Sequence, residues 1–217
     1  MNVHNGLDWQ FLGQQLCLLP QKALYWKDKN MLIVADVHMG KVGHFRKAGI
    51  AIPKLMEQED LAVLSDLIHD LKPKTLLFLG DLFHSDMNND WEWLMLWRDL
   101  FPDLEMILVR GNHDILHDKY YHAARFKVVA ELELEPFLFT HEPVKEVHDL
   151  YPVSGHIHPG VLLRGKGRQF VTLPSFSFCK DQAILPAFGK FTGNVSLKYC
   201  DEDSVFGVLK NKVIKLS

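Results

Sequence analysis

Short apolar runs in this chain end in clusters of Asp, Asn and His. The runs are five to seven residues long, rich in Leu, Ile, Val and Phe, and bounded by Gly and polar residues. These features predict buried strands, because such strands favour bulky apolar side chains and end at turn-forming residues. The predicted strands cover residues 31–35, 75–80, 105–111, 136–140 and 151–155.

Two helical patterns separate the first three predicted strands. The first runs from Pro53 to Leu71, with apolar residues every three or four positions. The second is expected over residues 91–101, with Asn89 or Asp90 as its N-cap. This alternation of strands and helices predicts right-handed crossovers and a largely parallel sheet.

The second half of the sequence is expected to consist of strands and turns. It has no convincing long helical pattern, and its strand-like segments cover residues 126–141, 160–174, 194–200, 204–210 and 212–217. We therefore expect two packed sheets, with the helices of the first half outside one of them. No linker, repeat or low-complexity segment divides the sequence, so residues 1–217 are predicted to form a single α/β domain.

Composition places the sequence among ordinary globular proteins, since 47% of its residues are hydrophobic. No apolar stretch approaches the ~20 residues that span a bilayer, and the first residues lack the pattern of a signal peptide. The 3 cysteines show no CxxC spacing, which argues against a disulfide framework or a thiolate zinc site. We expect a cytoplasmic protein without a membrane segment. With a net charge of -3, any phosphate binding must be local.

The polar clusters carry side chains that bind divalent metal ions. Any one cluster could be an ordinary polar turn. However, the carboxyl ends of neighbouring strands share one rim of an open α/β sheet, so this fold would bring the clusters together. The DxH and HxH pairs also place two donors on the same side of an extended chain. The candidate ligands are Asp36, His38, Asp81, Asn112, His141, His156 and His158.

This donor set indicates two metal ions. Seven N and O donors without sulfur exceed one tetrahedral zinc site and suit two divalent ions of borderline hardness. Mn²⁺ is the first expectation, with Fe or Zn as alternatives. Asp81 is the candidate bridge between the ions, because a carboxylate offers two oxygens and a negative charge.

The same residues carry a resemblance to a known family. The blocks DVH, GDLFH, GNHD, HEP and GHIH, in this order, resemble those of the calcineurin-like metallophosphoesterases. The resemblance implies a four-layer α/β/β/α sandwich and a dinuclear centre that hydrolyses phosphoesters by attack of a metal-bridged hydroxide. It implies that one ion is held by Asp36, His38, Asp81 and His158, and the other by Asp81, Asn112, His141 and His156.

Three further residues acquire expected roles in this setting. His113 is expected to point toward the substrate and to stabilise charge or protonate the leaving oxygen. Asp114 is expected to accept a hydrogen bond from a ring nitrogen of His113 and to set its tautomer and pKa. The GDLFH block is similar to that of the double-strand-break repair nucleases, which implies that His84 reaches toward the scissile phosphate. The alternative is that His84 only caps its loop.

A narrower resemblance extends over almost the whole sequence. The stretches CLLPQKALYW, ADVHMGKVGHFRKAGIAIP and LPAFGKFTG are similar to those of bacterial ligase-associated DNA damage response phosphoesterases (PdeM-type). This implies metal-dependent phosphodiester or endonuclease cleavage of DNA in DNA repair. It also implies an ATP-dependent DNA ligase, a nuclease and a helicase as candidate partners.

Basic residues occur at two further places in the sequence. Lys41, His44 and Arg46 follow the first ligand cluster and could hold a phosphate backbone near the metals. The alternative for them is a solvated loop whose charges balance nearby acidic residues. For the basic residues of the predicted hairpin turn at 164–168, the solvated turn is the favoured interpretation.

Two classes of function therefore stay open. The first is a DNA-directed phosphodiesterase, with a phosphomonoesterase or cyclic-nucleotide phosphodiesterase as the alternative among enzymes. The second is a non-catalytic module on the same fold that recruits repair partners. The presence of both His113 and Asp114 favours an enzyme. The sequence lacks a phosphate-binding P-loop, a helical HExxH and a GxSxG motif, which excludes three other enzyme classes.

Overall fold

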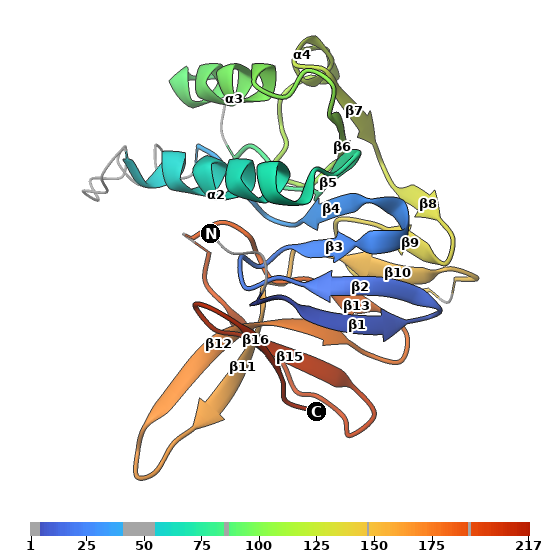
Figure 1. Cartoon of the computed structure of the whole chain (residues 1–217), viewed down its shortest axis with the longest axis vertical. Helices are drawn as coiled ribbons and strands as arrows, with labels where there is room; N and C mark the ends of the chain where they lie inside the picture. The colour runs from blue at the N-terminus through green and yellow to red at the C-terminus, as the bar shows by residue number, and fades with distance from the viewer. Residues whose placement is uncertain (1–4, 41–54, 85–86, 147, 191) are drawn as a thin grey trace.

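The structure is a computed structural model that describes residues 5–40, 55–84, 87–146, 148–190 and 192–217. Figure 1 shows two stacked β-sheets with helices on one side. The expected α/β class with two packed sheets is confirmed. Among the described helices, none is both long enough and apolar enough to cross a membrane.

The first sheet has seven strands that are arranged in chain order. They are β1 (Leu7–Phe11), β2 (Gln14–Leu18), β3 (Leu24–Trp26), β4 (Met31–Val34), β5 (Thr75–Leu79), β6 (Glu105–Val109) and β7 (Phe126–Val129). Strands β4 to β7 pair in parallel, as the alternation of strands and helices predicts. Strands β1 to β4 pair antiparallel. A 3₁₀ turn, η2 (Lys27–Lys29), joins β3 to β4.

The antiparallel half of this sheet differs from the sequence-based expectation, which contains no strand before residue 31. Every residue of β1 is half-buried or exposed, so this edge strand lacks a continuous apolar run. The turn to β2 uses left-handed backbone at Leu12 (φ 48°) and Gly13 (φ 77°). Such an edge hairpin is specified by its turn and its pairing more than by hydrophobic periodicity.

Among the described residues, three α-helices pack on the face of the first sheet that points away from the second sheet. They are α2 (Leu55–Leu71), α3 (Asn89–Asp99) and α4 (Asp118–Ala123). Leu64 and Trp97 belong to the buried cluster between these helices and strands β4 to β6. The side chain of Asn88 caps α3 by accepting from the backbone N–H of Asp90 at 2.8 Å. The cap thus lies one residue before Asn89 and two before Asp90, the two expected caps. Helix α4 is too short to show a helical pattern.

The second sheet is built from the second half of the sequence. Its main order is β14 (Val195–Ser196), β11 (Pro159–Arg164), β12 (Phe170–Phe178), β13 (Ala183–Ile184), β10 (Tyr151–Ser154), β9 (Phe137–Phe139) and β8 (Leu132–Leu134). Two further strands, β15 (Ser204–Val208) and β16 (Val213–Lys215), extend from β12. An aromatic core joins the two sheets, in which Trp26 contacts Phe137 and Trp9 contacts Phe206, each with ring centroids 5.0 Å apart.

The described helices all cover the first sheet, so these residues form α/β/β layers. The outer helical layer that the family resemblance implies over the second sheet is not among the described elements. This arrangement agrees with the strand-rich pattern of the second half of the sequence.

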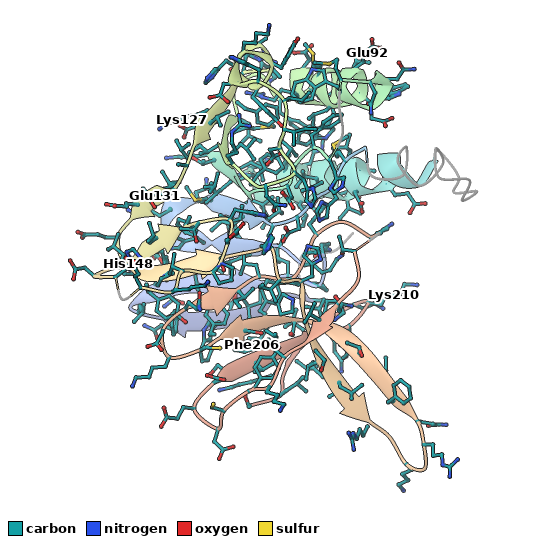
Figure 2. All side chains as sticks on the ribbon, turned by 180° about the vertical axis from the view of Figure 1, so that it is seen from behind. Glu92, Lys127, Glu131, His148, Phe206 and Lys210 are labelled. Carbon is teal, nitrogen blue, oxygen red and sulfur yellow. The ribbon has the colours of Figure 1, made fainter. Side chains whose placement is uncertain are left out.

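Strands β11 and β12 form a hairpin that projects from the body of the molecule (Figure 1; seen from behind in Figure 2). The inner half of β12 pairs with β15 and β13 inside the sheet. The outer half of β12 pairs with β11.

Candidate metal centre

Expected metal ligands follow the carboxyl ends of strands from both sheets. In the first sheet, Asp36 and Asp81 each stand two residues after their strands, β4 and β5. In the second sheet, His141 and His156 each stand two residues after β9 and β10. Because β4 pairs in parallel with β5, and β9 with β10, these positions meet at one edge of the sandwich.

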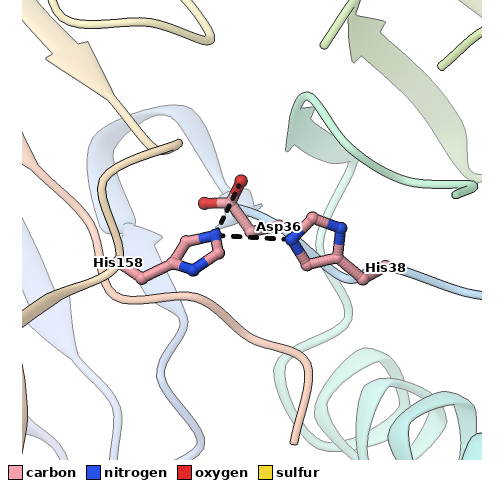
Figure 3. Close-up of side chains that lie close together, drawn as sticks. All are labelled: Asp36, His38 and His158. Carbon is pink, nitrogen blue, oxygen red and sulfur yellow. Dashed lines mark hydrogen bonds and ion pairs between the residues drawn. The ribbon is translucent and has the colours of Figure 1, made fainter. Parts of the chain in front are cut away.

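One donor group consists of Asp36, His38 and His158 (Figure 3). The Nε2 atoms of His38 and His158 lie 3.3 Å apart. Nε2 of His158 lies 3.5 Å from Oδ1 of Asp36. Asp36 is fully buried and His38 is 7% exposed. Three donor atoms thus converge on one buried point.

A second donor group consists of Asp81, His141 and His156. Nε2 of His141 lies 3.4 Å from Oδ1 of Asp81 and 3.2 Å from Nδ1 of His156. Oδ1 of Asn112 lies 3.0 Å from the same nitrogen. On its other side, Nδ1 of His141 lies 2.9 Å from the carbonyl oxygen of Leu79. A carbonyl can only accept, so Nδ1 carries the proton and Nε2 offers a lone pair to a metal.

Asp81 lies between the two groups. Its Oδ1 faces His141, whereas its Oδ2 is 3.9 Å from Nδ1 of His38 in the other group. The two carboxylate oxygens thus lie near histidines of different groups, and the role of Asp81 as a bridge stays a prediction.

The donor sets fit divalent metal ions. Oδ1 of Asp36 is buried and accepts no hydrogen bond from any described residue, although a buried carboxylate oxygen without a partner is costly. Two pairs of imidazole nitrogens also face each other at 3.2 and 3.3 Å. One cation in each group would satisfy these lone pairs, and imidazole with carboxylate suits ions such as Mn, Fe or Zn.

The ligand turns have unusual backbone geometry. Five expected ligands have positive φ angles without being glycine: Asp36 (54°), His38 (54°), Asp81 (51°), His156 (67°) and His158 (54°). Each such residue costs roughly 1–3 kcal/mol, and such strain persists where the surroundings over-determine it. The DxH and HxH segments are therefore not extended, and the prediction that each pair lies on one side of an extended chain is wrong. In particular, His156 and His158 enter different donor groups.

Hydrogen bonds and glycines hold these turns together. Oδ2 of Asp36 accepts from the backbone N–H of His156 at 2.9 Å, which ties the two sheets together. Gly155 permits this approach, because a Cβ there would lie 2.6 Å from Oδ2 of Asp36. Likewise, a Cβ on Gly111 would lie 2.3 Å from Oδ1 of Asp81. Both glycines are required by close packing against a ligand.

His113 and His84 lie together beside the donor groups. Their ring centroids are 3.8 Å apart, and the ring of His38 is 5.9 Å from that of His113 and 5.3 Å from that of His84. The backbone N–H of His113 donates to Oδ1 of Asp81 at 2.9 Å. The structure therefore places both predicted catalytic histidines at the site and leaves their roles as predictions.

Asp114 does not make its expected contact with the ring of His113. Its buried carboxylate instead accepts from the backbone N–H of Gly111 at 2.9 Å and of Phe83 at 3.0 Å. The hydroxyl of Tyr121 donates to it at 3.4 Å. The turn from Gly111 to Asp114 folds back on itself, which directs the carboxylate beneath the loop. Burial raises the pKa of Asp114 to about 6, against the opposing effect of the two backbone hydrogen bonds.

Two supports of the ligand turns are absent from the sequence-based predictions. Arg110 stacks on Tyr121 with 5.2 Å between its guanidinium carbon and the ring centroid, donates to the carbonyl of Asp114 and pairs with Asp118. On the other side, the backbone N–H of Gly189 donates to the carbonyl of Asp36 at 3.1 Å. The Arg directly before GNHD was a signal for the first support. The second depends on tertiary contact alone.

A cavity of about 610 Å³ adjoins Asn112 and His141 and is also lined by Arg110 and Glu142. Another cavity, of about 670 Å³, has a lining that includes Leu12, residues 144–146 and residues 148–152, but none of the expected site residues. Only the first could hold part of a substrate bound at the donor groups. The expected substrate-binding residues Lys41, His44 and Arg46 lie outside the described residues.

Comparisons with known proteins agree with this geometry. The family model of calcineurin-like phosphoesterases matches residues 29–189, whereas a search of curated proteins gives no match. The crystal structure of the Pseudomonas putida nuclease MPE has a TM-score of 0.81 to this structure. The two chains are 29% identical over 98% of this chain and 100% of that one.

Two other solved structures are less similar. Yfce, a phosphoesterase from E. coli, has a TM-score of 0.45 and 14% identity, over 86% of this chain and 97% of its own. AQ665 of Aquifex aeolicus, a protein of unknown function, has a TM-score of 0.41 and 24% identity, over 64% of this chain and 82% of its own.

Proposed function

The chain belongs to the calcineurin-like phosphoesterase family and is a metal-dependent phosphoesterase, and we propose that it is a dinuclear phosphodiesterase that cleaves DNA as an endonuclease. The observation that carries this proposal is the pair of donor groups with Asp81 between them. The likeness to a nuclease over 98% of the chain supports a nucleic-acid substrate.

In this proposal, Asp36, His38 and His158 would hold one ion, and Asn112, His141 and His156 would hold the other. Asp81 would be shared between them. Mn²⁺ is the proposed metal. Divalent ions, when bound, neutralise phosphate charge and lower the pKa of water.

His113 and His84 are the proposed hydrogen-bond and proton donors to the substrate. His113 is half-buried, and its backbone N–H is fixed on Asp81. From this position we propose that its ring donates a hydrogen bond or a proton to the leaving oxygen of the substrate. His84, in ring contact with His113, is the proposed second contact to the scissile phosphate. Asp114 acts here through the backbone of the Gly111–Asp114 turn, as a positioning residue.

A comparison of substrates tests the proposal. Purified protein with Mn²⁺ is offered single-stranded DNA, duplex DNA, a phosphomonoester and a cyclic nucleotide. We expect internal cleavage of DNA to be the fastest reaction. Preference for the monoester or the cyclic nucleotide would support the alternative enzymes. Absence of turnover on every substrate, with metals bound, would support a non-catalytic scaffold.

Substitution of Asp81 tests the two-metal centre. Asp81→Asn weakens the bridge, so we expect it to lose metal and activity together. Metal analysis of the purified variant is the measurement. Two metals per chain with near-normal turnover would contradict the role of Asp81 as the bridge. Asp103→Asn, at an exposed site, is the matched control.

The cellular setting is a further part of the proposal. The cysteine usage supports a cytoplasmic protein. The resemblance described above supports a role in DNA repair with an ATP-dependent DNA ligase, a nuclease and a helicase as partners. Co-purification of the tagged protein with each candidate, with DNA removed by a nuclease, measures direct association.

A further inference from the structure

The hairpin of β11 and β12 has an outer part with little support from the rest of the protein. We call residues 161–173 the finger. β14 pairs with β11 only at Pro159 and Gly160, and β15 pairs with β12 only from Ser175 onward. Within the described part of the chain, the finger is therefore a two-stranded ribbon. Such a ribbon alone is marginally stable in water.

Apolar side chains are exposed on the finger. Phe170 is 75% exposed and Val171 51% exposed. These exposed side chains do not pack into the core of the protein. Core packing therefore does not explain why the finger projects. An exposed aromatic side chain is suited to contacts with another molecule.

The finger also carries an isolated positive charge. Arg164, Lys166 and Arg168 are exposed, and none forms an ion pair with another described residue. Residues 155–180 contain no Asp or Glu, although the whole chain has a net charge of -3. The positive charge is thus concentrated in this stretch, which is the electrostatic pattern of a polyanion contact.

The strand register places one cation and the exposed aromatic ring on one face. Arg164 is directly opposite Phe170 across the two strands, so their side chains are neighbours on the same face. The turn between them, closed by the backbone N–H of Gly165 donating to the carbonyl of Gln169 at 2.9 Å, carries the other two cations. Backbone phosphates attract the cations, and nucleobases can stack on the ring.

The finger begins beside the metal centre. β11 starts at Pro159, the residue after His158. Arg164 lies six positions after His158, which corresponds to about 20 Å at about 3.3 Å per strand residue. At about 3.4 Å per nucleotide along a duplex, this length covers about six base pairs.

We infer that the finger is a second nucleic-acid contact, in which Arg164, Lys166 and Arg168 bind the DNA backbone about six or more base pairs from the bond that is cleaved. The inference rests on the proposed DNA-cleaving function and adds a site to it. The finger gives the enzyme affinity for long DNA and adds nothing for substrates too short to reach it.

The test compares long and short substrates. The variant replaces Arg164, Lys166 and Arg168 together by Gln. The control replaces Lys72, Lys74 and Lys127 by Gln, which are exposed cations that change the net charge equally. Lys127 lies at the far end of the molecule from the finger (Figure 2). Substrates are a thirty-base-pair duplex, a single strand of equal length, a dinucleotide and bis-p-nitrophenyl phosphate.

We expect the finger variant to bind and cleave the long DNAs more weakly and to hydrolyse the two small diesters at the wild-type rate. Binding is measured with a chelator present, so that no cleavage occurs. Three lost contacts reduce the log–log salt slope by about 2.7 on duplex and about 2.1 on single strands. The ratio of the duplex binding constants of wild type and variant should then fall about 40-fold between 50 and 200 mM salt.

Other results overturn the inference in recognisable ways. An unchanged salt slope, or equal losses in the finger variant and the control, would show that the finger does not contact DNA. Equal losses on long and short substrates would show that the substitutions disturb the metal centre. Normal DNA binding together with a changed oligomeric state would identify the finger as a protein interface. Failure of the wild type to cleave any DNA would contradict the proposed function itself.

Discussion

His113 stands at the edge of both donor groups, with its backbone fixed on Asp81 and its ring against that of His84. We expect His113→Ala to keep both metals and to lose turnover by about 100- to 1000-fold, the usual effect of losing one hydrogen-bond donor to the transition state. The loss should be smaller on substrates with a nitrophenolate leaving group, which needs little protonation. Metal content and kcat are the measurements.

The control for this substitution is His148→Ala, at an exposed position away from the donor groups. It should retain both metals and normal kcat. A His113→Ala protein that has lost a metal would place His113 among the ligands and contradict the division of roles proposed here.

The buried carboxylate of Asp114 supports a different prediction, about stability. Asp114→Asn replaces one acceptor oxygen by an NH₂ group, which leaves either the N–H of Gly111 or that of Phe83 facing another donor. Loss of such a hydrogen bond should lower the free energy of unfolding by about 1–3 kcal/mol. Denaturant unfolding at neutral pH measures it, with Asp103→Asn as the exposed control. An unchanged midpoint would show that these hydrogen bonds contribute little.

At this scale, the sequence could predict the identity of the donors but not the direction of every side chain. Asp36 and Asp81 could be found because each follows an apolar strand. The orientation of Asp114 could not, because it depends on a turn whose hydrogen bonds reach back to Phe83. The left-handed backbone of His156 and His158 is likewise fixed by tertiary contacts that spacing does not reveal.

Helix α3 offers a test of how an element is delimited. Asn88→Ala should lower the free energy of unfolding by about 1 kcal/mol, because the backbone N–H of Asp90 loses its capping acceptor. Asn89→Ala, one residue later and exposed, should be neutral or slightly stabilising, since Ala has the higher helix propensity. Thermal unfolding of the two variants side by side is the measurement. A larger loss of stability in Asn89→Ala than in Asn88→Ala would place the cap at Asn89.

The elements themselves were predictable to different degrees. Strands β4, β5 and β6 are fully apolar or nearly so, because both of their faces are covered. Strand β1 could not be identified in the same way, because it is an edge strand in which no residue is fully buried. Strands β2 and β3 lie inside the sheet and have buried residues, but they have only five and three residues. Helix α4, with six residues, is too short for a periodic signal. The sequence predicts a hairpin turn at residues 164–168. That the hairpin projects could not be predicted, because it depends on β14 and β15 pairing only with the inner parts of β11 and β12.

At the scale of the whole molecule, each donor group draws on both sheets. Metal ions bound there would join the sheets, and a ligand that binds only the folded state stabilises it. Adding Mn²⁺ at about 100 times its dissociation constant to chelator-treated protein should contribute about 2.7 kcal/mol, or about 5–11 °C in Tm. Calorimetry measures it. Asp81→Asn should show a smaller rise, and an equal rise would locate metal binding elsewhere.

The division of the donor groups between the sheets also affects biosynthesis. One group requires His158, and the other requires His141 and His156. A growing polypeptide therefore holds Asp36, His38 and Asp81 well before either group can be completed. Because the ribosome supplies the last histidines only after the strands of the first sheet, neither donor group can be complete until that sheet has been synthesised. A metal ion that needs a complete donor group would therefore bind a chain whose first sheet is already present.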